Sequence, residues 1–158
     1  MDYPKIIIDT REQKPMWDPD LFDVKLQKMD EGDYTTEDLL GIAHIERKSP
    51  VDLYGSIIQG HVRFRKEIQR AVDKNIKLVI FVECPSEMFF KKRFPRGHLL
   101  KTPERTLRKI INTMKIKYNL EFVWCEDRDE MMDKMILWFV EQREKLLFKQ
   151  QKGKENEN

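Results

Sequence analysis

The apolar run "KLVIFVE" at residues 77–83 is the strongest β-strand signal in the chain, and the rest of the fold has to be built around it. Further strands are predicted at residues 5–9, 22–29 and 121–125, and a hairpin is predicted from residues 32–36 and 41–47. Helices are predicted at residues 50–74, with a break near Gly60, and at 103–118 and 127–149. An early antiparallel meander followed by alternating strands and helices indicates an α/β protein, with helices flanking a mixed sheet.

The length and composition indicate one globular domain. The chain has 158 residues, of which 40% are hydrophobic and 37% are charged. We assign residues 1–150 to the domain and expect the polar tail at 151–158 to be disordered. No apolar stretch reaches the roughly 20 residues that span a bilayer, and the first residues do not resemble a signal peptide. Together with two cysteines, which we expect to be buried thiols, this predicts an intracellular protein without a membrane partner, cytoplasmic or nucleoid-associated in a prokaryotic or viral setting.

The net charge of +2 hides an uneven distribution of charge along the chain. Residues 1–60 carry 7 basic and 13 acidic side chains, whereas residues 61–120 carry 16 basic and 5 acidic ones. Residues 121–158 carry 7 basic and 10 acidic side chains. A basic middle third suggests a polyanionic partner, and the acidic first third suggests carboxylates gathered for a separate purpose.

Three carboxylates fall at the ends of predicted strands. Asp9 closes the first strand, Asp33 opens one arm of the hairpin, and Glu46 closes the other arm. Several carboxylates brought together are unfavourable unless a cation neutralises them, and hard oxygen ligands suit Mg²⁺ or Mn²⁺. Lys48 lies two residues after Glu46, so both side chains point to the same face of an extended chain. This pattern is compatible with a site for phosphodiester hydrolysis.

Each of these residues also has a simpler structural interpretation. Asp9 and Asp33 both lie in turn-like segments. Asp52 completes a capping box that begins at Ser49 and would start a helix at Pro50. Glu46 and Lys48 would, on their own, be an ordinary surface charge pair.

The order of the motifs distinguishes the site from these alternatives. The segments I-D-T-R-E-Q, G-D-Y and E-R-K-S-P-V-D resemble the nuclease domain of the XPF family, whose pattern is V-D-x-R-E, then G-D, then E-R-K-x-x-x-D. The resemblance extends through the apolar strand that ends at Glu83 and is only approximate beyond it. Matching positions are Asp9, Arg11, Glu12, Gly32, Asp33, Glu46, Arg47, Lys48 and Asp52, with Ile8 in place of the valine.

The resemblance implies a restriction-endonuclease-like fold and a Mg²⁺- or Mn²⁺-dependent enzyme. By position, Asp33 and Glu46 would be the main metal ligands, assisted by the backbone carbonyl of Arg47, and Asp9 would support this site or a second ion. Lys48 would position the attacking water. Glu12 and Asp52 are the remaining candidates for the catalytic site. They would order the basic side chains of the site by ion pairing.

Candidate DNA-binding residues lie in the basic middle third and beside the first motif. A helical stripe formed by Arg63, Lys66, Arg70 and Lys74 could follow a phosphate backbone, or it could be a solvated helix face. In the connection at residues 84–102, three phenylalanines alternate with basic residues and could either stack on unpaired bases or anchor the loop to the core. The other candidates for DNA binding are Arg11, Lys91, Lys92, Arg93 and Arg96.

The resemblance implies an endonuclease that cleaves branched or flap DNA at single-strand to double-strand junctions, as in repair or recombination. One alternative is a non-catalytic DNA-binding scaffold, and another is a nuclease of the same fold that acts on Holliday junctions or unbranched DNA. Family members commonly carry a tandem helix-hairpin-helix domain after the nuclease domain. We expect no second domain in the present sequence, so either the basic middle third binds DNA alone or a partner protein supplies DNA binding. The surplus of apolar residues on the last helix, with the resemblance, favours a homodimer or heterodimer.

Overall fold

The computed structural model describes residues 4–157 and contains a six-stranded mixed sheet in the order β2-β1-β3-β4-β5-β6. β1 pairs in parallel with β2 and antiparallel with β3, β3 pairs antiparallel with β4, and β4, β5 and β6 are parallel. The strands are β1 (Ile6–Ile8), β2 (Val24–Leu26), β3 (Tyr34–Thr36), β4 (Ala43–Lys48), β5 (Lys77–Val82) and β6 (Glu121–Trp124). The predicted α/β class with a mixed central sheet is confirmed.

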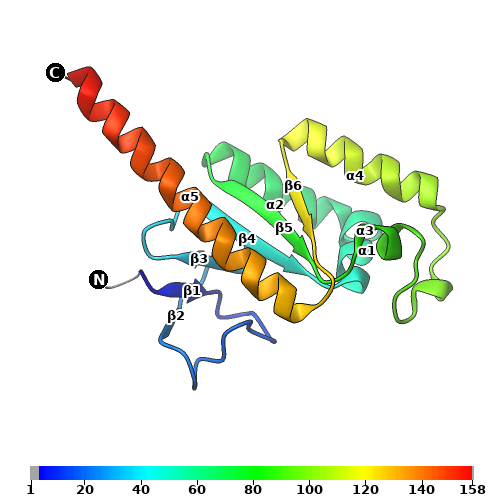
Figure 1. Ribbon diagram of the computed structural model, residues 1–158. Helices are drawn as coiled ribbons and strands as arrows, with labels where there is room; N and C mark the ends of the chain where they lie inside the picture. The colour runs from blue at the N-terminus through cyan, green and yellow to red at the C-terminus, as the bar shows by residue number, and fades with distance from the viewer. Residues whose placement is uncertain (1–3, 158) are drawn as a thin grey trace.

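Helices cover both faces of this sheet (Figure 1). α1, α2 and α4 pack on one face, with α3 near the end of β5, and α5 crosses the opposite face. The helices are α1 (Pro50–Ile58), α2 (His61–Asp73), α3 (Ser86–Phe90), α4 (Glu104–Tyr118) and α5 (Arg128–Glu157), with a 3-10 turn η1 (Gly97–Leu99) between α3 and α4.

The apolar sequence of β5 explains this three-layer arrangement. Leu78, Ile80 and Val82 join the core beneath α1, α2 and α4. Val79 and Phe81 point the other way, into the core beneath α5. Because successive strand residues face opposite sides, a strand that is apolar throughout is buried on both faces.

The early strands differ from the predicted antiparallel meander. β2 is shorter than the predicted strand at residues 22–29 and pairs in parallel with β1 at the edge of the sheet. A parallel pair needs a crossover, which residues 9–23 provide while burying Met16 and Trp17. The ring of Trp17 meets that of Tyr34 edge-on at 5.7 Å between centroids. The local pattern of β2 predicted the strand but carried no information about its partner.

The helical segment after β4 begins and breaks as predicted. The Ser49 hydroxyl accepts a hydrogen bond from the backbone N–H of Asp52 at 3.1 Å, and Pro50 starts α1. α1 ends at Ile58, and Gly60 is the N-cap of α2. This short break allows α1 and α2 to pack separately on the sheet.

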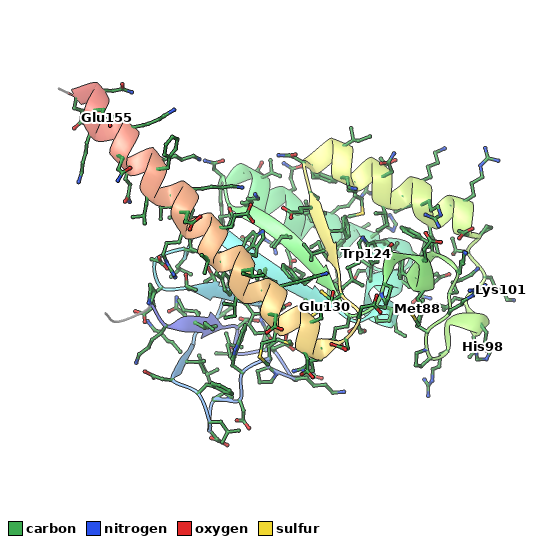
Figure 2. All side chains as sticks on the ribbon, in the orientation of Figure 1. Met88, His98, Lys101, Trp124, Glu130 and Glu155 are labelled. Carbon is green, nitrogen blue, oxygen red and sulfur yellow. The ribbon has the colours of Figure 1, made fainter. Side chains whose placement is uncertain are left out.

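The last helix is longer than predicted. α5 continues through Glu157, past residue 151, where the sequence predicted the start of a disordered tail. Its C-terminal end, where Glu155 lies, projects away from the sheet (Figure 2). Gln, Lys and Glu have good helix propensity, and extending an existing helix costs less than nucleating one, so the polar composition did not indicate a helix end.

The expectation for the two cysteines is borne out at this level. Cys84 and Cys125 are buried free thiols, and burial raises the pKa of each to about 11. Across residues 4–157, none of the helices combines the length and apolarity that a bilayer span requires.

Candidate active site

Backbone hydrogen bonds hold the ends of β1, β3 and β4 together where the predicted acids lie. The N–H of Asp9 donates to the carbonyl of Asp33 at 2.8 Å, and the N–H of Asp33 donates to the carbonyl of Ile45 at 2.7 Å. Gly32 permits this close approach, because its φ is +80° and a Cβ there would lie 3.0 Å from the Ile45 carbonyl oxygen. The G-D pair is therefore required by the backbone as well as by chemistry.

Asp33 is partly buried and Glu46 is buried, and the two carboxylates lie close enough for the charge of Asp33 to act on Glu46. Burial raises the pKa of Asp33 to about 7, although a 2.7 Å hydrogen bond from the backbone N–H of Arg47 opposes the rise. Burial and then the charge of Asp33 raise the pKa of Glu46 well above its ordinary value. The charge of Asp33 therefore disfavours ionisation of Glu46, as expected for carboxylates that lie close together.

Lys48 is the cation placed beside this pair. Its Nζ lies 3.4 Å from Oε1 of Glu46 and 5.0 Å from the centroid of the Phe64 ring. The charge of Lys48 opposes the rise in pKa at both Asp33 and Glu46. The aromatic ring and the carboxylate together hold the ammonium group at the site.

Asp9 belongs to the same junction but uses its carboxylate differently from the prediction. One oxygen accepts from Nε of Arg11 at 3.0 Å, and the other accepts from the N–H of Met29 at 2.8 Å. Arg11 also donates to the Met29 carbonyl. Asp9 thus anchors the segment that leads to Asp33, and the predicted role as a metal ligand remains a prediction.

Arg47 is the centre of a partly buried ion network behind the acids. Its guanidinium group binds both oxygens of Glu12, at 2.7 and 3.1 Å, and Oε1 of Glu83 at 2.8 Å. Arg128 reaches the same Glu83 oxygen at 3.2 Å. Burial opposes a low pKa at Glu12, but the hydrogen bonds from Arg47 outweigh it and lower the pKa. Glu12 therefore orders Arg47, as the sequence predicted.

Asp52 does not join this network in the structure. It lies exposed in the first turn of α1, where its backbone N–H supports the Ser49 cap. The N-cap at Ser49 is confirmed, whereas the reciprocal hydrogen bond from Ser49 to the Asp52 carboxylate is not among the hydrogen bonds of residues 4–157. The ion pairing predicted for its carboxylate has no counterpart among the salt bridges of residues 4–157.

Glu67 of α2 faces the site, although the sequence analysis did not select it. Its charge raises the pKa of Asp33, and its carboxyl group is close enough to Glu46 for a hydrogen bond between the two acids to raise the pKa of Glu46. Its position three residues after Phe64, on the buried side of α2, was the signal that could have identified it.

The donor set suits a hard divalent cation that keeps part of its water shell. Within residues 4–157, no three His, Cys, Asp or Glu side chains are arranged as a coordination sphere. Mg²⁺ usually binds proteins through one or two carboxylates and completes its shell with waters and substrate phosphates. The two carboxylates of Asp33 and Glu46 fit this requirement.

Part of the predicted basic stripe has partners within the molecule. The buried carboxylate of Glu31 lies 2.6 Å from Nζ of Lys74 and 3.6 Å from Nε of Arg70. Arg70 also donates to the carbonyl of Asp30 at 3.2 Å. Arg63 and Lys66, in contrast, are exposed at the start of the stripe.

The phenylalanines of the connection between β5 and α4 anchor it to the core. The aromatic rings of Phe89, Phe90 and Phe94 are buried, and the first two lie 5.4 and 5.5 Å from the ring of Trp124. Met88, His98 and Lys101 mark this connection at the end of the molecule near Trp124 (Figure 2). The interpretation that these rings stack on bases is therefore wrong, and the core-anchoring alternative is correct.

The basic residues of the connection remain at the surface or hold the loop. Lys91 pairs with Glu87 at 3.5 Å, and Lys92 donates to the carbonyl of Thr102 at 2.6 Å. Arg93 and Arg96 are exposed. Their predicted contact with DNA stays a prediction.

The fold is a mixed α/β sheet that places acids and a lysine at its strand ends. The family model of the ERCC4 domain matches residues 2–136, and the chain belongs to this family. The resemblance to XPF-family nuclease domains is thereby confirmed.

Solved structures support the same fold. The chain is similar to XPF from Aeropyrum pernix in complex with DNA, with a TM-score of 0.65, 20% identity, and coverage of 90% of this chain and 66% of that one. It is also similar to XPF from Aeropyrum pernix, with a TM-score of 0.61, 20% identity, and coverage of 84% and 62%. The chain thus spans a little under two thirds of the length of these structures. No curated protein matches the sequence significantly.

Proposed function

We propose that this domain is a metal-dependent endonuclease that hydrolyses DNA phosphodiester bonds at branched or flap structures. The observation that carries the proposal is the pair of Asp33 and buried Glu46, with Lys48 Nζ 3.4 Å from Glu46. Membership of the ERCC4 domain family supports a nuclease, and the similar structure of XPF in complex with DNA supports DNA as the partner.

Asp33 and Glu46 are the residues that would hold Mg²⁺ or Mn²⁺. A divalent ion bound there would neutralise the two carboxylates and act as a Lewis acid toward a phosphate oxygen. The backbone N–H of Arg47 fixes one oxygen of Asp33 at 2.7 Å, so this carboxylate is held in one orientation. A fixed ligand loses little conformational freedom when it binds.

Lys48 would act on the phosphate and the attacking water. Its ammonium group is oriented by Glu46 and by the face of the Phe64 ring. From this position it can donate hydrogen bonds to the water or to the negative charge that develops on the phosphate. The network of Arg47, Glu12 and Glu83 supports the strand from behind and keeps β4 in register with β5.

DNA would approach over α2, where Arg63 and Lys66 are exposed in the same helix that contributes Phe64 to the site. Phosphate contacts from such residues position a duplex without reading its sequence. A separate DNA-binding partner protein would increase affinity. The alternative role as a non-catalytic scaffold would not require Asp33, Glu46 and Lys48 to be retained together.

We also propose that the protein forms a dimer through the outer side of α5. Met131, Met135 and Trp138 are buried in the core, but Leu137 and Phe148 remain 67% and 57% exposed. Exposed apolar side chains along one helix are typical of an association surface. Sedimentation equilibrium is expected to give a dimer that Leu137→Asp dissociates, and a wild-type monomer at all concentrations would contradict the proposal.

The cleavage assay that tests the function uses end-labelled DNA. The substrates are a 3′ flap, a splayed arm, a four-way junction, a duplex and a single strand, each incubated with Mg²⁺, Mn²⁺ or EDTA. Metal-dependent cutting near the junction of the flap or splayed arm is expected. Preferential cutting of the four-way junction or the plain duplex would contradict the proposed substrate, and tight binding without cutting in either metal would indicate the scaffold role.

A further inference from the structure

The carboxylate of the half-buried Glu67 has one shielded oxygen without a hydrogen-bond donor. Its Oε1 atom is shielded from solvent and has no partner among residues 4–157. An unsatisfied buried acceptor costs free energy, and in native structures such a group commonly marks a water or ion. α2 is packed on the sheet through Phe64, Ile68 and Ala71, so this position on the helix is fixed toward the site.

The neighbours of Glu67 do not satisfy this oxygen. Glu46, whose carboxyl group it meets, is itself an acceptor and donates only if one of the two acids carries a proton. The ammonium group of Lys48 is 3.4 Å from Glu46 and is not paired with Glu67. Three acidic groups therefore share one lysine at the site proposed to hold a divalent ion.

We propose that Glu67 is an outer-shell residue of the divalent-cation site, accepting a hydrogen bond from a water of the cation that Asp33 and Glu46 bind. This inference rests on the proposed function. It explains the orphaned oxygen without requiring a third direct ligand, for which residues 4–157 show no arrangement. Mg²⁺ and Mn²⁺ retain waters, and residues that hold those waters orient the ion and increase its affinity.

The position of Glu67 on α2 also has a consequence for DNA binding. Arg63 and Lys66 lie on the same helix within one turn of Glu67. A cation held partly through Glu67 would therefore fix the helix that presents these basic residues to the phosphate backbone. Glu67 is a positioning residue in this account, because it acts through the cation and its water.

The test measures Mn²⁺ affinity by isothermal titration calorimetry on the whole chain without DNA. The proteins are wild type, Glu67→Ala, Glu67→Gln and a control, Asp73→Asn, which removes an exposed charge from the same helix. We expect Glu67→Ala to weaken Mn²⁺ binding about tenfold or more, and Asp73→Asn to leave it unchanged. Glu67→Gln should have a smaller effect, because the amide oxygen still accepts a hydrogen bond.

Unchanged Mn²⁺ affinity in folded Glu67→Ala would overturn the inference. Thermal unfolding in EDTA reports folding independently, and Glu67→Gln preserves the side-chain shape if the alanine variant is unstable. Asp33→Asn separates the two proposals. If Asp33→Asn abolishes Mn²⁺ binding and neither Glu67 variant changes it, only the role of Glu67 fails. If the wild type binds no Mn²⁺, both the inference and the proposed metal site fail.

Discussion

At Asp33, burial and a single hydrogen bond act on the pKa in opposite directions, and burial is stronger. The pKa of about 7 lies above that of an unfolded aspartate, so between about pH 4 and pH 7 the folded protein binds more protons than the unfolded chain. Stability from this group is therefore complete at low pH and is lost as the pH rises through the folded pKa. The same sign applies to Glu46, whose pKa is also raised by burial.

We predict that Asp33→Asn removes part of this pH dependence. In EDTA, the free energy of unfolding of the wild type should fall relative to the variant by up to about 1.4 kcal/mol per pH unit between pH 4 and pH 7. Urea unfolding at several pH values measures the difference directly. Parallel stability curves for the two proteins would show that burial does not hold Asp33 in its protonated form.

Single residues also show what a sequence can and cannot reveal about the site. Asp33, Glu46 and Lys48 were identified because their order and spacing form a motif on adjacent strands. Glu67 was missed because it belongs to no motif, and its spacing from Phe64 is informative only once α2 is known to pack that side on the sheet. Asp9 was identified by the motif, but the sequence did not indicate that Arg11 and Met29 occupy its oxygens.

At the scale of elements, α2 combines a buried face with a basic face, and part of that basic face is ion-paired within the molecule. Residue spacing predicted the stripe of Arg63, Lys66, Arg70 and Lys74. The pairing of Arg70 and Lys74 with Glu31 could not be predicted, because it depends on a tertiary contact. The sequence of the connection after β5 was also ambiguous, because alternating aromatic and basic residues fit both a DNA-binding loop and a core anchor. Burial of the phenylalanines decides between these two readings.

We predict that the two ends of α2 differ in their contribution to DNA binding. Arg63→Gln should weaken binding and reduce the slope of log K against log salt by about one. Arg70→Gln should change the salt slope less, because Glu31 and the Asp30 carbonyl already hold that side chain. Fluorescence anisotropy at several salt concentrations measures both slopes. Equal slopes for wild type and Arg63→Gln would assign Arg63 to the solvated helix face.

At the scale of the whole molecule, the strand at the centre of the sequence analysis also organises the structure. β5 joins the two cores, and its two faces carry α1, α2 and α4 on one side and α5 on the other. The fold class and nearly all elements could be predicted from local patterns. The parallel pairing of β2 and the length of α5 could not, because one depends on a distant partner and the other continues through Gly153 and Asn156, residue types that commonly end helices.

The central claim is that Asp33, Glu46 and Lys48 together cleave DNA, and single-turnover cleavage of a flap substrate with Mg²⁺ tests it most directly. The comparison uses wild type, Glu46→Gln, Lys48→Ala and a control, Lys25→Ala, at an exposed position on the edge strand β2. DNA affinity and thermal unfolding are measured on the same proteins. We predict that Glu46→Gln and Lys48→Ala reduce the cleavage rate by about a hundredfold or more while DNA binding and folding are retained. Wild-type cleavage rates in either variant would contradict the account.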